Sequence, residues 1–361
     1  MSDALARAEL AAAGRFTRLC TDWLEERVEV EVALLVHSAT AALEMMALLL
    51  ELESGDEVIM PSFTFSSSAT AVTLRGATPV FVDIRPDTLN LDETLIEDAI
   101  TQRTKAIMAV HYAGVPCEMD SINELAARHG LAVIEDAAQA LLSTYKGRQA
   151  GGLGDAAAIS FHETKNVHCG EGGALLVRRT DWVDRSLILR DKGTNRVRFL
   201  RGQVDKYSWV DIGSSYGLGE LSAAFLWGQL ERAEEVLEER RRVWNTYHER
   251  FAPLEELGLL RRPVVPEHVD HNAHLYYILV ADIEERTLVI QELDRRGVHA
   301  VFHYVPLHSA RAGRRYGRAH GDLAETDRAS DRLVRLPLWY RMPDEAVHQV
   351  TDAVAEVVAQ R

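Results

Sequence analysis

The chain has 361 residues, 47% of them hydrophobic and 26% charged, and its formal net charge is −15. This length allows two globular domains with a sizeable core, and the acidic balance argues against general nucleic-acid binding, which requires a basic surface. Because no apolar stretch approaches the roughly 20 residues of a membrane span, and because the N-terminal stretch is broken by charges unlike a signal peptide, we expect a cytoplasmic protein.

The first part of the chain alternates regularly between helices and strands. The predicted elements are helix 2–28, strand 32–36, helix 38–52, strand 57–60, a helix ending near 75, strand 79–83, helix 92–100, strand 105–110, helix 118–129 and strand 131–134. Strands separated by helices of this length indicate βαβ units and a mostly parallel sheet.

The second part begins with two more apolar strands and continues into a smaller unit. The predicted elements are strands 156–161 and 174–177, one long helix over 219–251 with a bend allowed, a linker containing Pro263 and Pro266, strand 276–280, helix 285–296, strand 299–302 and helix 344–359. This pattern predicts a large domain over 1–235 and a small α+β domain over 236–361.

Lys165 lies on the connection between the apolar runs 156–161 and 174–177. A lysine held among apolar neighbours loses its proton readily, because desolvation disfavours the charged form. The neutral amine is the form that adds to a carbonyl group. The alternative is a surface lysine on a loop.

Asp136 directly follows the apolar strand 131–134, and Gln139 comes three residues later. Chemistry in open parallel sheets collects at the carboxyl ends of strands, where an aspartate can keep a pyridine nitrogen protonated. The alternative for Asp136 is an N-cap. The combination with Ser160 and Lys165, about 30 residues on, is more specific than any single part.

Two further stretches are candidates for holding a phosphorylated ring. The small and hydroxyl residues of 37–42 open a helix, and free N–H groups at a helix start suit a phosphate; plain capping by Ser38 or Thr40 is the alternative. Phe63 and Phe65 follow strand 57–60. Either aromatic ring can stack on a flat ring or can pack in the core.

The segment 190–206 carries six positive and two negative side chains, a net +4 in an acidic chain. Such a patch suits a diphosphate, although a solvated loop is an equal alternative. The segment 303–308 follows strand 299–302, where aromatic and histidine side chains either line a cleft between domains or pack structurally.

Other site types find no support in the sequence. The three cysteines, Cys20, Cys117 and Cys169, lack paired spacing, which favours a reducing compartment over a disulfide framework. There is no metal-ligand spacing, no P-loop and no G-x-G-x-x-G in a suitable context.

The stretches 135–139 (Glu-Asp-Ala-Ala-Gln) and 160–166 (Ser-Phe-His-Glu-Thr-Lys-Asn) resemble those of the DegT/DnrJ/EryC1/StrS family, and the resemblance covers nearly the whole chain. It implies a fold-type-I aminotransferase dependent on pyridoxal 5′-phosphate, with the pyridoxamine form as intermediate. The implied α/β fold has a large, mixed, mostly parallel seven-stranded sheet flanked by helices and a smaller C-terminal α+β domain.

The resemblance also implies roles for individual residues. Lys165 holds the cofactor and moves the proton, Asp136 maintains the pyridinium charge, and Gln139 bonds the phenolic oxygen. The other implied cofactor contacts are Thr40, Ala41 and Ser160 at the phosphate and Phe65, rather than Phe63, on the ring. The implied substrate contacts are Lys192, Arg196, Lys206, Tyr207, His303 and Tyr304.

The similarity is greatest to members that form dTDP-4-amino-4,6-dideoxygalactose or the corresponding glucose derivative. It implies amino transfer from L-glutamate to C4 of a dTDP-4-keto-6-deoxy-D-hexose, in antibiotic or surface-glycan sugar biosynthesis, by a homodimer. Alternatives are a C3 aminotransferase, a sugar 3-dehydratase, which Lys165 argues against because histidine replaces the lysine there, and a non-catalytic cofactor-binding sensor. One departure is Gly217, where many relatives carry an asparagine that reaches the partner subunit's cofactor phosphate.

Overall fold

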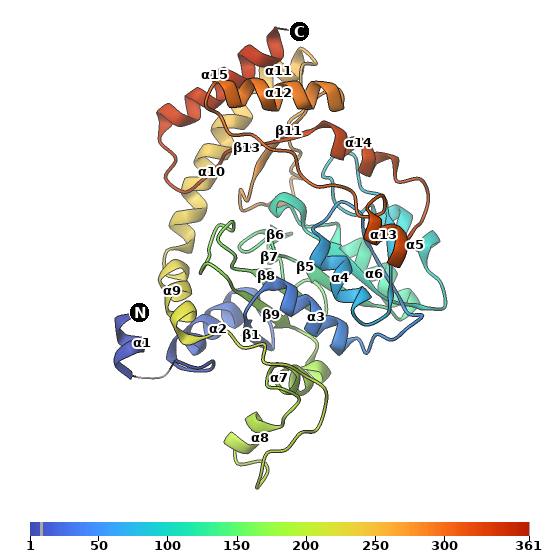
Figure 1. Cartoon of the computed structure of the whole chain (residues 1–361), viewed down its shortest axis with the longest axis vertical. Coiled ribbons are helices and arrows are strands. Elements are labelled where there is room, and N and C mark those ends of the chain that lie inside the picture. The colour runs from blue at the N-terminus through green and yellow to red at the C-terminus, as the bar shows by residue number, and fades with distance from the viewer. Residues whose placement is uncertain (8–9, 361) are drawn as a thin grey trace.

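An eight-stranded sheet runs through the larger part of the molecule (Figure 1). The structure, a computed structural model, describes residues 1–7 and 10–360. The strands, in the order in which they pair, are β1 (Val32–Val36), β9 (Gly173–Val177), β8 (Ala156–Ser160), β5 (Ala132–Asp136), β4 (Thr104–Val110), β2 (Glu57–Pro61), β3 (Thr78–Val82) and β12 (Arg318–Ala319). From β8 to β12 all neighbours are parallel, whereas β9 is antiparallel to both of its neighbours.

The predicted α/β class and mostly parallel sheet are therefore confirmed, but the sheet has eight strands and not seven. The additional strand, β12, has two residues and pairs with Val80 and Phe81 of β3. Its Arg318 guanidinium forms an ion pair with buried Glu57 at 3.0 Å. A two-residue strand has no periodicity in the sequence, so only the long-range contact reveals it.

Helices cover both faces of this sheet, and alternate strand residues enter two separate cores. Ile59 belongs to the core under one set of helices, whereas its neighbours Val58 and Met60 belong to the core under the other. The first set is α2 (Arg15–Val28), α5 (Ile96–Ala99), α6 (Met119–His129) and α9 (Glu220–Leu230), and the second is α3 (Ala39–Leu49), α4 (Ser66–Thr73) and α7 (Val183–Arg190). Burial on both faces explains why these strands are almost continuously apolar.

The N-terminal prediction of one helix over 2–28 is wrong. The described residues form α1 (Ser2–Arg7) and α2, and residues 8 and 9 lie outside the described part. The Glu220 carboxylate accepts hydrogen bonds from the N–H groups of Phe16 and Thr17, both at 2.9 Å. Since a distant carboxylate caps α2 at its first turn, the helix begins at Arg15.

A second, smaller unit lies beyond α10 (Ala233–Arg250), which runs from α9 toward the far end of the molecule (Figure 1). The single helix predicted over 219–251 is interrupted between Leu230 and Ala233, where a bend was allowed. The unit contains α11 (Ala252–Glu256), β11 (Tyr276–Leu279), α12 (Ile283–Arg295), α14 (Ala324–Arg332), β13 (Leu333–Leu336) and α15 (Asp344–Ala359). The short helix α13 (Arg311–Tyr316) directly precedes β12, which pairs in the large sheet. The domain boundary at residue 235 stays a prediction.

The predicted strand 299–302 is wrong, and β13 was missed. In the structure Val301 makes an isolated bridge with Arg335 of β13, which pairs along its whole length with β11. The strand that pairs with β11 therefore lies 54 or more positions further along the chain, and a local sequence pattern does not identify it. No helix among the described residues is long and apolar enough to cross a membrane.

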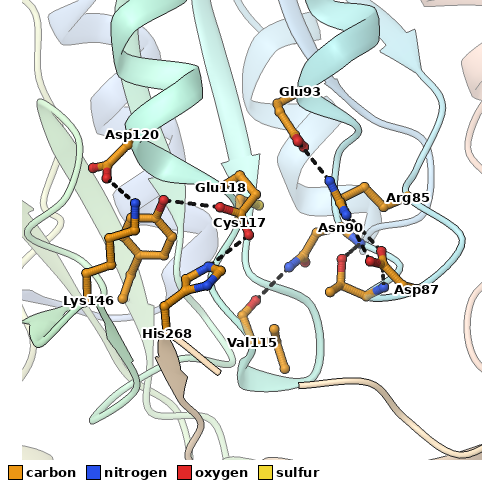
Figure 2. Close-up of polar contacts among 12 residues, drawn as sticks. Arg85, Asp87, Asn90, Glu93, Val115, Cys117, Glu118, Asp120, Lys146 and His268 are labelled. Carbon is orange, nitrogen blue, oxygen red and sulfur yellow. Dashed lines mark hydrogen bonds and ion pairs between the residues drawn. The ribbon is translucent and has the colours of Figure 1, made fainter. Parts of the chain in front are cut away.

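The segment 268–274 joins the two units. Its β10 (Val269–Asp270) extends the hairpin of β6 (Thr144–Tyr145) and β7 (Arg148–Gln149). Glu118, directly before α6, bonds with His268 Nε2 at 2.9 Å (Figure 2). It also accepts a hydrogen bond from the Tyr145 hydroxyl at 3.1 Å. Asn272 then donates hydrogen bonds to the carbonyls of Gln139 and Leu141, both at 2.8 Å. These bonds hold the small unit against the carboxyl end of β5.

Candidate active site

A cavity of about 500 Å³ lies at the carboxyl ends of β4, β5 and β8, between the large sheet and the small unit. This position is the one expected for ligand sites of open α/β sheets. Eight of the predicted site residues line it: Thr40, Phe65, Asp136, Gln139, Ser160, Lys165, His303 and Tyr304. The structure therefore gathers most of the predicted cofactor residues in one place.

Lys165 lies on the loop between β8 and β9, in a turn in which its N–H donates to the carbonyl of His162 at 2.9 Å. The next residue, Asn166, bonds to the small unit through the Asn272 carbonyl at 2.8 Å and His274 Nδ1 at 3.2 Å. Both units therefore determine where the amine lies.

The environment of Lys165 lowers its pKa to about 8. Burial is the main cause, because it removes water from the ammonium; the Asp136 carboxylate opposes the shift, and the Arg335 guanidinium adds to it. A substantial fraction of the amine is therefore neutral near physiological pH, as carbonyl chemistry requires.

This shift predicts how the free amine responds to pH. In the cofactor-free protein, acylation of Lys165 by an amine-selective reagent should rise about tenfold per pH unit below pH 8 and level off above it, because only the neutral amine reacts. Peptide mass spectrometry measures the rate, with the urea-denatured protein as reference. A rate that keeps rising to about pH 10, as for an unperturbed lysine, would contradict the shift.

Asp136 ends β5 with its carboxylate at the cavity. The carboxylate accepts hydrogen bonds from Ser68 Oγ at 2.7 Å and from the N–H of Ala138 at 3.2 Å. Both bonds fix its direction. Its neighbour Glu135 points to the opposite face of the sheet, as strand alternation requires, and bonds there with His111 at 2.8 Å.

The buried Glu135 is structural. Burial alone would raise its pKa, but the bonds from His111 and from the N–H groups of Gly151 and Gly154 lower it. A fully paired internal carboxylate of this kind fixes the carboxyl end of β5 and the turn at 151–154.

Gln139 and Tyr304 are bonded to one another in the cavity. The Gln139 amide nitrogen donates to the Tyr304 hydroxyl at 2.7 Å, and its oxygen accepts from the N–H of Ala113 at 2.8 Å. The Tyr304 ring stacks on His303, with 3.8 Å between centroids, and lies 6.5 Å from that of Phe65. Gln139 and Tyr304 thus join the large-domain wall to the segment 303–308.

The start of α3 also lines the cavity. Ser38 caps the helix by accepting from the N–H of Ala41 at 3.1 Å, and Thr40 Oγ1 bonds with Ser67 Oγ at 2.8 Å. Ala41 is buried and does not line the cavity. A Cβ at Gly173 would come within 2.5 Å of Ala39 N, so glycine is required where β9 passes this helix start.

Four predicted substrate residues lie elsewhere. Lys192, Arg196, Lys206 and Tyr207 belong to the segment around α8 (Arg196–Leu200), which projects from the body beyond α7 (Figure 1). None of them lines the cavity. Lys192 and Arg196 pair with Asp191 at 3.2 and 3.5 Å. Their contact with substrate stays a prediction.

Steric crowding explains why position 217 is a glycine in this chain. A Cβ at this position would lie 2.7 Å from the Cβ of Ala12. The turn before α2 therefore occupies the space that a side chain at position 217 would need.

Three residues of the site were missed from the sequence: His274 and Arg335, which line the cavity, and Ser68, which bonds to the Asp136 carboxylate. His274 and Arg335 lie in the small unit, far along the chain from Lys165. The alternation in Leu333-Val334-Arg335-Leu336 was the available signal for a strand with one polar side chain on its cavity face.

The donor set fits pyridoxal phosphate. A partly neutral lysine, an oriented carboxylate and a helix start with hydroxyl side chains line one cavity large enough for a substituted pyridine. A model of the DegT/DnrJ/EryC1/StrS aminotransferase family matches residues 2–355.

The chain belongs to this family. It is 37% identical over 306 residues to GDP-perosamine synthase from Caulobacter vibrioides, covering 83% of this chain and 79% of that protein. The solved structure of Spr1654 from Streptococcus pneumoniae in its PMP form superposes with a TM-score of 0.91 at 28% identity, covering 99% and 95% of the two chains. DesV from S. venezuelae gives 0.89 at 32%, covering 99% and 92%.

The predicted fold class, cofactor and enzyme class are therefore confirmed. The protein is a pyridoxal-phosphate-dependent sugar aminotransferase. Spr1654 has also been solved in its PLP form, so both cofactor forms occur on this fold.

Proposed function

We propose that this aminotransferase transfers the amino group of L-glutamate to C4 of a dTDP-4-keto-6-deoxy-D-hexose, yielding a dTDP-4-amino-4,6-dideoxyhexose for antibiotic or surface-glycan biosynthesis. The observation that supports amino transfer is the meeting of a desolvated lysine, Lys165, with the oriented carboxylate of Asp136 in one cavity. The choice of C4 over C3 rests on the near-full-length resemblance of the chain to C4 transaminases.

In this proposal the cofactor supplies an electron sink for the electron pair of the broken C–H bond. Lys165 Nζ accepts the proton from Cα of the donor and later delivers a proton to C4 of the sugar, first as base and then as acid. Asp136 keeps the ring nitrogen protonated, and Gln139 orients the ring through its phenolic oxygen. Ser160 and Thr40, with the helix start at Ala41, hold the phosphate, and Phe65 covers the ring.

We propose further that the enzyme acts as a homodimer. The projecting segment around α8 exposes apolar side chains, including Leu200 at 68% and Trp209 at 80%, as surfaces that a second copy would cover. In such a dimer Lys192, Arg196, Lys206 and Tyr207 are candidates for contacts with the nucleotide diphosphate. Light scattering coupled to gel filtration tests the oligomeric state.

Proton NMR of the product tests the substrate and the stereochemistry. Purified enzyme is incubated with dTDP-4-keto-6-deoxyglucose and L-glutamate. A large H3–H4 coupling identifies the equatorial amine of the gluco product, and a small coupling identifies the galacto product.

A parallel incubation with the GDP-linked 4-keto sugar tests the nucleotide. Turnover with only that substrate contradicts the dTDP proposal. Absence of any product from 4-keto sugars, with the cofactor still converted by glutamate, contradicts C4 and favours a 3-keto sugar.

A further inference from the structure

Arg335 is a cation directed into the active-site cavity from the small unit. It lies on β13 between Val334 and Leu336, both of which are buried in the core of the small unit, so alternation places the Arg335 side chain on the other face. Its backbone is held by Val301 through hydrogen bonds of 2.7 and 3.1 Å. A strand paired in this way holds a long side chain in a defined direction.

The guanidinium of Arg335 makes no hydrogen bond or ion pair with any side chain or backbone group of the described residues. The nearby buried Arg240 differs, because its guanidinium donates to the carbonyls of Ala273, His274 and Leu338. Arg240 is therefore held by carbonyl groups of the protein, whereas the Arg335 guanidinium, unpaired within the described residues, can donate to a ligand in the cavity.

The other described side chains of the small unit that line the cavity carry no negative charge. His274 and His303 line the cavity beside it. Burial, together with the positive charges of Lys165 and Arg335, lowers the pKa of His303 to about 3 and that of His274 well below its usual value, so both rings are neutral. Neither ring can compensate the guanidinium. The carboxylates of Asp136 and Glu171 line the same cavity, but among the described residues neither forms an ion pair with Arg335, which leaves the guanidinium able to bind an anionic ligand group.

We propose that Arg335 binds the α-carboxylate of the amino donor. The Arg335 guanidinium is close enough to Lys165 to act on it electrostatically, and the α-carboxylate is attached to the same carbon whose proton Lys165 removes. A planar guanidinium matches a carboxylate through two parallel N–H···O bonds. This inference rests on the proposed use of L-glutamate and adds the residue that recognises it.

The position of Arg335 favours the carboxylate over a diphosphate. Arg335 lines the cavity from the small unit together with His303 and Tyr304 and acts electrostatically on Lys165, whereas the free N–H groups suited to phosphate lie at the start of α3. A nucleotide diphosphate is separated from the reacting carbon by a sugar ring and would lie farther from Lys165.

The experiment titrates the holoenzyme with 2-methyl-L-glutamate, which has an α-carboxylate but no Cα hydrogen, and follows the cofactor absorption. Arg335→Met should weaken this binding by roughly 10- to 100-fold, the effect of losing a charge-assisted pair. Arg335→Lys should recover part of it. Titration with dTDP should give a wild-type affinity for both variants.

Arg314→Met, on the exposed α13, is the matched control and should bind 2-methyl-L-glutamate like the wild type. Unchanged binding of this amino acid by Arg335→Met would overturn the proposal, as would a weakened affinity for dTDP with the amino acid unaffected. If the wild type responds to 2-aminoisobutyrate but not to 2-methyl-L-glutamate, glutamate is not the donor. In that case, the affinities of Arg335→Met and Arg335→Lys for 2-aminoisobutyrate test whether Arg335 binds the α-carboxylate of the donor.

Discussion

Lys165→Ala will lower amino-transfer turnover by about 10⁴-fold, at the upper end of the effect of removing a positioned acid–base group. Its amine is partly neutral near pH 8, lies in the cavity with Asp136, and is the group we assign to both proton transfers. Steady-state kcat with L-glutamate and the keto sugar measures the loss. Cofactor binding should survive in part, because the phosphate and ring contacts remain.

Lys105→Ala is the matched control, because that lysine is exposed and forms an ion pair with Asp56 at 3.7 Å. It should retain wild-type turnover. A thermal unfolding midpoint near that of the wild type shows that the Lys165→Ala variant is folded, and added methylamine should restore part of its activity. Turnover within tenfold of the wild type would remove Lys165 from the reaction.

Asp136→Ala will weaken cofactor binding by roughly 10- to 100-fold, the loss expected for a charge-assisted hydrogen bond, and will slow turnover further. The carboxylate is buried and oriented by Ser68, so its charge acts at short range with little screening. Fluorescence titration of the cofactor-free variant with pyridoxal phosphate gives the affinity, and kcat at saturating cofactor gives the catalytic loss.

Asp136→Asn separates charge from shape. The amide keeps an oxygen that can accept from Ser68 and keeps the volume, but it cannot stabilise a protonated ring nitrogen. We expect near-wild-type stability with a turnover as low as that of the alanine variant. An asparagine variant with wild-type turnover would show that Asp136 only shapes the cavity.

The structure brings together in one cavity the candidate residues that had a strong local signal in the sequence. Lys165 and Asp136 follow apolar strands, and strand ends of a parallel sheet meet at one edge, so their meeting in one cavity follows from the order of elements. The predictions that failed depended on distant partners. The helix predicted over 2–28 is interrupted where Glu220 caps α2, and the strand predicted at 299–302 is replaced by β13 as the partner of β11.

The amino-acid sequence alone determined the α/β class, the mostly parallel sheet and the edge of the sheet where Lys165 and Asp136 lie, because apolar periodicity and the residues at strand ends can be recognised in short stretches of neighbouring residues. Only the tertiary structure decided the small-unit wall of the cavity. His274 reaches the site because Asn272 is bonded to the large domain, and Arg335 reaches it because β13 pairs with β11. Such contacts join residues more than a hundred positions from Lys165, and their geometry depends on the packing of two units, which no local pattern encodes.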